Sequence, residues 1–107
     1  MFRRAARTDE NQRSIVAGLR RAGASVAVTS IVGKGFPDLV VGAYGGTSLI
    51  ELKNPSKPKC DRKLTEDQAE FRQSWKGRII TVETLQQALD EIEHLRRLAL
   101  ALRGMRP

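Results

Sequence analysis

The chain has 107 residues, of which 40% are hydrophobic and 29% are charged, a balance typical of one globular domain that buries its own core. Its net charge of +7 favours a polyanionic partner, with nucleic acid as the first candidate and an anionic membrane surface as the second. No apolar run approaches the roughly 20 residues of a membrane span, and no signal peptide is visible. The single Cys60 excludes an internal disulfide, so we expect the protein in the reducing cytoplasm.

Hydrophobic patterning and turn residues predict seven elements. In chain order they are a helix that Thr8 caps and Gly23 ends, strands over 25–32, 38–43 and 47–53, a helix that Thr65 caps and Gly77 ends, a strand over 78–82, and a helix that starts near Thr81 or Thr84 and runs to about Leu102. This order, α-β-β-β-α-β-α, predicts a single α/β domain over residues 1–107 in which helices flank a mixed four-stranded sheet.

Local signals add detail to these elements. Residues 1–7 form a basic arm that we expect to be mobile. Gly45-Gly46 is expected to close a hairpin between the second and third strands, and Thr65 with Gln68 matches a capping box. The first helix is expected to bury one apolar face, formed by Ile15, Val16, Leu19 and Ala22.

Asp38, Glu51 and Lys53 are the candidate functional residues. A two-residue turn at Gly45-Gly46 pairs Val40 with Glu51 and Asp38 with Lys53. Because side chains alternate along a strand, the three charged groups then share one face near the open end of the hairpin. The simpler alternative is a structural ion pair on an exposed hairpin.

Two carboxylates and an ammonium group in this arrangement suit metal-assisted chemistry on a phosphate. Mg²⁺ and Mn²⁺ prefer oxygen ligands, which Asp38, Glu51 and a backbone carbonyl can supply. Such a metal lowers the pKa of a bound water and offsets charge on the phosphate. Lys53 is suited to orient that water or to stabilise the developing charge. The residue types therefore predict a nuclease with a divalent metal cofactor.

A loop rich in Pro and Lys follows the proposed site, from Asn54 to Lys63. Cations beside a metal site neutralise phosphates and make binding to DNA depend on salt. The alternative is a solvated loop that binds nothing. Cys60 has no neighbours suited to bind zinc. The candidate DNA-binding residues are Lys34, Lys57, Lys59, Arg62 and Lys63.

Taken together, these residues resemble the PD-(D/E)XK nuclease superfamily, and more closely its small phage-type virus-type replication-repair nuclease (VRR-NUC) domains. The resemblance extends from about Asp9 to Leu89. It implies a restriction-endonuclease-like core and Mg²⁺- or Mn²⁺-dependent cleavage of DNA. It rests on Gly33-Lys34-Gly35-Phe36-Pro37-Asp38, Glu51-Leu52-Lys53, Lys63-Leu64-Thr65-Glu66-Asp67-Gln68 and Trp75-Lys76-Gly77.

The resemblance also implies a role for each matching residue. Asp38, Glu51 and the backbone carbonyl of Leu52 are expected to bind the metal, and Lys53 is expected to be the catalytic lysine. Gln68 is implied to belong to the active site, although on local grounds it is the capping-box partner of Thr65, and it can do both.

The first helix departs from the family pattern, because such nucleases usually carry a Glu there that helps to hold the metal. Helical spacing puts Gln12 on the side of the apolar face and Glu10 on the opposite side. We therefore expect Gln12 to occupy the usual Glu position, with Glu10 as a metal ligand only if the helix starts irregularly. A neutral residue there lowers the negative charge of the site and weakens metal binding.

The last helix, over 83–103, predicts a symmetric homodimer, because its apolar positions follow an a/d spacing and further leucines widen the stripe. The alternative is a core helix with a frayed end. Small phage-type relatives with two sites related by a twofold axis look like Holliday-junction resolvases, which implies branched DNA as the substrate. The stripe comprises Leu85, Ala88, Ile92, Leu95, Ala99 and Leu102, widened by Leu89, Leu98 and Leu100.

Two other classes of function stay open. A non-catalytic nucleic-acid-binding protein on a nuclease scaffold is favoured by the missing Glu of the first helix. A protein of the membrane surface is disfavoured because the last helix carries both charge signs. For the leading interpretation, we expect the protein in the cytoplasm of a bacterium or of a phage-infected cell.

Overall fold

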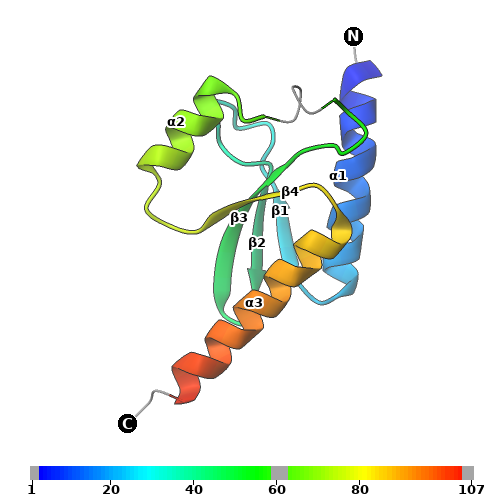
Figure 1. Cartoon of the computed structure of the whole chain (residues 1–107). Helices are drawn as coiled ribbons and strands as arrows, with labels where there is room; N and C mark the ends of the chain where they lie inside the picture. Colours follow the sequence, from blue (N-terminus) through cyan, green and yellow to red (C-terminus); the bar gives the residue numbers. More distant parts are fainter. Residues whose placement is uncertain (1–2, 59–62, 105–107) are drawn as a thin grey trace.

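Four short strands form one mixed sheet whose spatial order, β1-β2-β3-β4, follows the chain. The protein is described by a computed structural model that covers residues 3–58 and 63–104, with side chains from residue 10 onward. The first three strands are antiparallel neighbours, and β4 runs parallel to β3 (Figure 1). The predicted order and sheet type are confirmed. The elements are α1 (Arg3–Arg21), β1 (Ser25–Val28), β2 (Leu39–Ala43), β3 (Gly46–Leu52), α2 (Glu66–Ser74), β4 (Ile79–Val82) and α3 (Leu85–Gly104).

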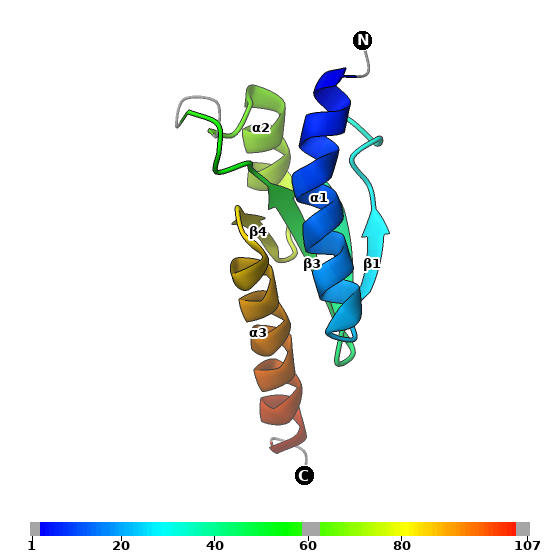
Figure 2. The ribbon, with the colours of Figure 1, turned by 90° about the vertical axis from the view of Figure 1, so that its right-hand side faces the viewer.

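Alternating side chains of β3 direct two helices to opposite faces of the sheet. Ser48 donates a hydrogen bond to Glu91 of α3, whereas Glu51 accepts one from Gln68 of α2. Residues at even and odd positions of a strand point to opposite faces. Helices α1 and α3 lie alongside each other over the first face (Figure 2). Helix α2 lies on the second face, near the end of β3.

The hydrophobic core lies between the sheet and helices α1 and α3. Three of the four apolar residues predicted for the first helix are buried there, but Ala22 is exposed. No helix in the described ranges is both long enough and apolar enough to span a membrane. The buried residues of the core are Ile15, Val16, Leu19, Ala24, Leu39, Val41, Ile50, Val82, Ala88 and Ile92.

The hairpin between β2 and β3 turns one residue earlier than predicted. Ala43 pairs with Gly46, so the two-residue turn is Tyr44-Gly45 rather than Gly45-Gly46. Tyr44 and Gly45 both have positive φ, at 55° and 80°, as a type I′ turn requires. The pairing register therefore moves by two residues. A shift by two, unlike a shift by one, leaves every side chain on its predicted face.

Two other boundaries differ from the sequence expectation. Helix α1 begins at Arg3, so most of the predicted basic arm is helical and Thr8 is inside the helix rather than at its cap. Strand β1 ends at Val28 rather than at residue 32, because two turns follow it. In the first turn the Val32 N–H donates a hydrogen bond to the Thr29 carbonyl, and in the second the Phe36 N–H donates to the Gly33 carbonyl.

Helix α3 starts with a cap at Thr84, whose side chain accepts a hydrogen bond from the Gln87 N–H. Its first half packs on the sheet, and its second half extends beyond the strands (Figure 1). The predicted a/d stripe is thus divided. Ala88, Ile92 and Leu95 are core residues, whereas Leu102 is 65% exposed.

Candidate active site

Asp38 and Glu51 bring two carboxyl groups together at one end of the sheet. The register pairs Leu39 with Ile50, so the next position along the two strands brings Asp38 beside Glu51. Asp38 Oδ2 accepts a hydrogen bond of 2.8 Å from the Leu52 N–H. The two carboxyl groups also lie within hydrogen-bonding reach of each other. Both side chains are on the predicted face of the sheet.

Gln68 links Glu51 to Lys53. Its Nε2 donates to Glu51 Oε2 at 2.6 Å, and its Oε1 accepts from Lys53 Nζ at 2.8 Å. The Lys53 ammonium lies 3.8 Å from the same Glu51 oxygen. Gln68 Oε1 also accepts from the Thr65 N–H, and the Thr65 side chain accepts from the Gln68 N–H. Gln68 is therefore both a capping-box residue and a hydrogen-bond partner of Glu51 and Lys53, and its role in an active site stays a prediction.

The environment of Glu51 holds a proton on its carboxyl group. Burial, followed by the charge and hydrogen bond of Asp38, raises the pKa of Glu51 to about 8. The charges of Lys53 and Arg72 act in the opposite direction, but they do not offset the burial. Two adjacent carboxyl groups do not both ionise readily. A cation between them would remove this conflict, and the geometry is therefore suited to a positively charged ligand.

Arg72 belongs to the surroundings of the site but was not singled out from the sequence. It follows Gln68 by one turn of α2, a spacing that puts both residues on one side of the helix and could have indicated it. Its Nη2 donates to Thr81 Oγ1 at 2.8 Å, and Thr81 pairs with Glu51 between β4 and β3. Its Nε is buried without a hydrogen-bond partner among the residues that the structure describes.

The two candidate residues of α1 face different hollows. Glu10 is exposed and shares a hollow with Asn54 and Ser56, which lie one and three residues after Lys53 in the chain. Within the described ranges, neither Glu10 nor Gln12 forms a hydrogen bond or ion pair with Asp38 or Glu51. Gln12 is half-buried in a hollow whose other residues are Arg13, Val16, Arg20 and Val28.

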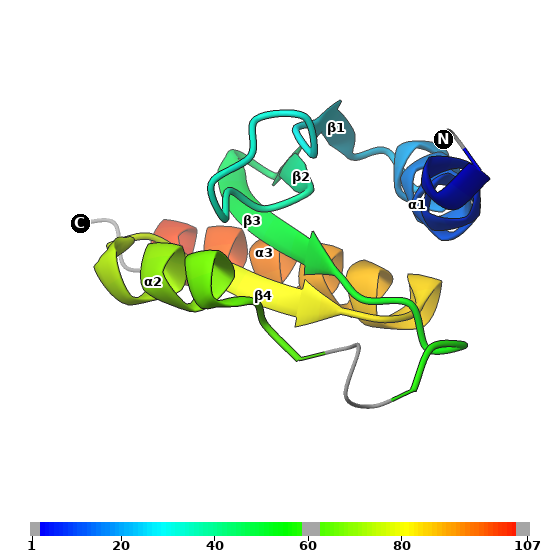
Figure 3. The ribbon, with the colours of Figure 1, turned by 90° about the horizontal axis from the view of Figure 1, so that it is seen from above.

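Three of the five candidate DNA-binding residues lie in the described part of the chain, and all three are exposed: Lys34, Lys57 and Lys63. Lys59 and Arg62 lie outside the described residues. Gly35 places the loop that contains Lys34 against the first turn of α2, because a Cβ atom at residue 35 would lie 2.2 Å from the Asp67 carbonyl oxygen. Figures 1 and 3 both show this loop beside α2.

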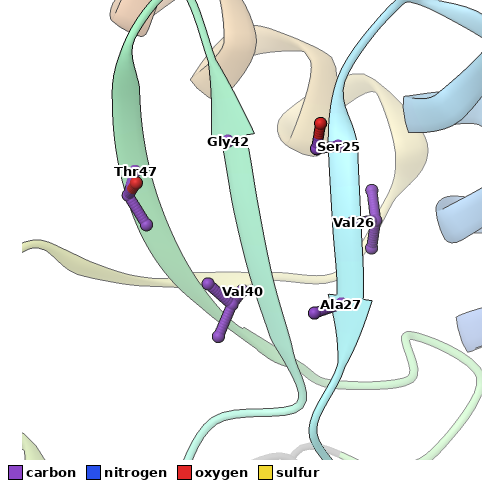
Figure 4. Close-up of a pocket in the computed structure, with 6 residues that line it drawn as sticks. All are labelled: Ser25, Val26, Ala27, Val40, Gly42 and Thr47. Atoms are coloured by element: carbon purple, nitrogen blue, oxygen red, sulfur yellow. The ribbon is translucent and has the colours of Figure 1, made fainter.

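A separate hollow occupies the same face of the sheet, away from the carboxyl groups (Figure 4). Its walls contain no titratable side chain, so it offers neither an acid, a base nor a metal ligand. The titratable side chains of this face, Asp38 and Glu51, do not line the hollow. The residues that line the hollow are Ser25, Val26, Ala27, Val40, Gly42 and Thr47.

The donor atoms at the charged end fit a hard divalent cation in part. In a strand, the N–H and C=O groups of one residue point to the same side, so the Leu52 carbonyl faces the side on which its N–H meets Asp38. Two carboxylates and this carbonyl are oxygen ligands suited to Mg²⁺ or Mn²⁺. No third His, Cys, Asp or Glu joins them within residues 3–58 and 63–104.

Comparisons of the chain with protein-family models, with curated proteins and with solved structures find no match.

Proposed function

We propose that the chain is a Mg²⁺- or Mn²⁺-dependent endodeoxyribonuclease of the PD-(D/E)XK type, close to the VRR-NUC domains. The observation that carries the proposal is the hydrogen-bonded cluster of Asp38, Glu51, Lys53 and Gln68 at the end of β3. Neighbouring carboxyl groups with a lysine beside them are costly to bury for structure alone. They are well suited to hold a cation next to a phosphate.

In this proposal, Asp38, Glu51 and the Leu52 carbonyl would hold the metal, which when bound would lower the pKa of a water and offset charge on the phosphate. Gln68 fixes the Lys53 ammonium near the Glu51 carboxylate through its amide. The ammonium then orients the attacking water or stabilises the developing charge. Exposed lysines near the site neutralise neighbouring phosphates of the strand.

Lys53 and Asp38 test the assignment directly. Lys53→Met is expected to lower Mn²⁺-dependent cleavage by about 100-fold or more, because it removes a charge that acts in the transition state. Asp38→Asn is expected to abolish the response to Mn²⁺. Binding of DNA in Ca²⁺ should change little for both variants. Cleavage is measured on labelled four-way junctions, flaps, linear duplexes and single strands, with and without Mn²⁺.

Lys76→Met is the matched control, because Lys76 is an exposed lysine without an assigned role. It removes the same charge and is expected to keep wild-type cleavage. Wild-type rates in both the Lys53 and the Asp38 variants would contradict the assigned roles.

A branched substrate and a homodimer complete the proposal. Leu98, Leu100 and Leu102 are 45%, 46% and 65% exposed on the end of α3 that extends beyond the sheet. A second copy that covers these leucines would relate two sites by a twofold axis. Two such sites suit symmetric cleavage of a branched DNA such as a Holliday junction.

A non-catalytic nucleic-acid-binding protein is the second candidate. It is favoured by the presence of only two carboxylates in the described cluster and by the lack of contact between Glu10 and that cluster. The same panel separates the candidates. Binding of junctions without cleavage of any substrate in Mn²⁺, under conditions where the protein is folded, would favour the binding protein.

A further inference from the structure

Two β-branched apolar side chains are exposed on the loop between β1 and β2. Ile31 is 93% exposed and Val32 is 57% exposed. Val28, which ends β1 three residues before Ile31, is 44% exposed. Single exposed apolar residues are ordinary, but a contiguous group indicates a surface that another molecule covers.

The loop is held in place by contacts at both ends. Thr29 donates through its side chain to the Pro37 carbonyl at 2.8 Å and through its N–H to the Asp38 carbonyl at 2.7 Å. At the other end, the Phe36 ring packs edge-on against the Phe71 ring of α2, with centroids 5.2 Å apart. The exposure of Ile31 is therefore a property of a braced loop.

The loop backbone also favours one conformation. Gly33, Lys34 and Gly35 have φ values of 78°, 55° and 80°, in the left-handed region that glycine adopts without strain. Gly35 lies so close to the Asp67 carbonyl that no side chain fits there. Ile31 and Val32 directly precede this constrained stretch, and their side chains are exposed.

The surroundings of the apolar group match a polyanion. Lys34 is exposed on the same loop, and residues 29–36 include no acidic residue. On the other side, Val28 lines a hollow together with Arg13 and Arg20 and no acidic side chain. Apolar side chains flanked by cations are a combination that enters DNA between base steps while the cations contact phosphates.

The loop is also continuous with the candidate active site. It ends at Asp38, and its Gly35 touches the helix turn that contains Gln68. The loop that carries Ile31 and Val32 therefore leads directly into the end of the sheet where Asp38 lies.

We propose that Ile31 and Val32 form an apolar wedge that enters unstacked bases of DNA beside the cleavage site. The wedge rests on the proposed nuclease function and names its substrate class: DNA in which a base step is already open, at a branch or flap, rather than continuous duplex. Unstacking a base step costs free energy, so a substrate that is open before binding is preferred.

The test uses the full chain and DNA that carries 2-aminopurine, a base whose fluorescence rises when it unstacks. The probes are a four-way junction with the label at the branch and a linear duplex of matched sequence, both in Ca²⁺. We compare the wild type, Ile31→Ser/Val32→Ser, and the matched control Ile31→Met/Val32→Ile, which keeps both positions apolar.

The wild type and the apolar control are expected to raise the fluorescence of the junction. The serine variant should lose most of that rise and bind the junction about tenfold more weakly, with little change for the duplex. Because both side chains are exposed, its thermal unfolding should match the wild type. Retention of the fluorescence rise and of the junction preference by the serine variant would overturn the wedge, as would unfolding of that variant.

Two further outcomes separate the wedge from the nuclease proposal. A fluorescence rise without any Mn²⁺-dependent cleavage would refute the nuclease and keep the wedge. Cleavage of junction and duplex at equal rates, without a rise, would keep the nuclease and refute the wedge. A change of oligomeric state in the serine variant, measured by light scattering, would assign the apolar group to a second copy of the chain and refute its contact with DNA.

Discussion

At neutral pH, the carboxyl group of Glu51 is largely protonated in the metal-free protein, since burial and Asp38 raise its pKa to about 8. In the unfolded chain the ordinary pKa is near 4.5, so between these values the folded state holds a proton that the unfolded state releases. The free energy of unfolding therefore falls as the pH rises from about 5 to 8. A metal bound as proposed would displace that proton, so we expect metal affinity to rise over the same interval.

Glu51→Gln removes this titration while keeping the shape of the side chain. Without metal, we expect the variant to melt above the wild type, by a difference that grows from pH 5 to pH 8 and reaches roughly 5 °C. With Mn²⁺ at pH 8, only the wild type should gain thermal stability. Glu66→Gln, at an exposed position, is the control. Melting curves that stay parallel over this pH range would contradict the assigned burial of Glu51.

Gly35 supports the site through a close backbone contact. An alanine there would be strained at a φ of 80°, and its Cβ would collide with the Asp67 carbonyl. Gly33→Ala is a matched control, because Gly33 has a similar φ of 78° but open space around it. We expect Gly33→Ala to cost about 1 kcal/mol, whereas Gly35→Ala should cost clearly more and should displace Gln68. Thermal unfolding and cleavage rates check this, and equal effects of the two variants would contradict the contact.

The candidate site residues were largely predictable, for reasons specific to each. Asp38, Glu51 and Lys53 were identified from their alternation on two strands, and that alternation survives a register shift by two. Gln68 was placed by the capping box with Thr65. Arg72 was missed although it follows Gln68 by one turn of α2, because that spacing alone does not show that the packing of α2 places its charge near Glu51.

At the scale of elements, α3 is joined to the sheet through the buried carboxylate of Glu91 and the partly exposed Arg78. Glu91 is 4% exposed and accepts hydrogen bonds from Arg78 Nε at 2.6 Å and from the Ser48 hydroxyl. Burial alone would raise the pKa of Glu91, but these hydrogen bonds hold it below its ordinary value. The stabilisation is therefore present above about pH 4.5 and is lost as the pH falls through the lowered pKa.

Arg78→Met would leave a buried carboxylate without its cation, so we expect a loss of about 2–3 kcal/mol in the free energy of unfolding. Arg96→Met is the control, because Arg96 pairs with Glu93 at the surface and should contribute less than about 0.5 kcal/mol. Urea unfolding at pH 7 measures both. The double variant Arg78→Met/Glu91→Met should recover part of the loss. Equal stability of Arg78→Met and Arg96→Met would contradict the role of the Arg78–Glu91 pair.

The order and type of the elements followed from the sequence, whereas their ends did not. Hydrophobic periodicity is a property of whole elements and predicts them well. The hairpin turn was misplaced because Tyr44 adopts a positive φ that its residue type disfavours, beside two glycines that were the better candidates. The strand over 25–32 was extended too far because β-branched residues at 31 and 32 suit a strand in composition but lie in a turn.

For the whole molecule, the end of α3 that extends beyond the sheet predicts the oligomeric state. The chain measures 55 × 31 × 23 Å along its principal axes, and three exposed leucines lie on this end of α3. We expect a homodimer at micromolar concentration and expect Leu98→Ser/Leu102→Ser, which alters one side of the helix, to be monomeric. Arg103→Ser, at an exposed position of the same turn, should stay dimeric. Light scattering measures this, and a monomeric wild type would exclude the dimer.

The double role of Gln68 couples fraying of a helix to disassembly of a charge cluster. When the first turn of α2 opens, the amide leaves Thr65, Lys53 and Glu51 together, so local unfolding there and loss of the aligned ammonium are one event. Hydrogen exchange at the N–H groups of Thr65, Gln68 and Ala69, which this turn holds in hydrogen bonds, therefore reports on how often the cluster is assembled. Any ligand that binds the carboxylates and stabilises the cluster should slow that exchange, even though the ligand contacts no backbone atom of the helix.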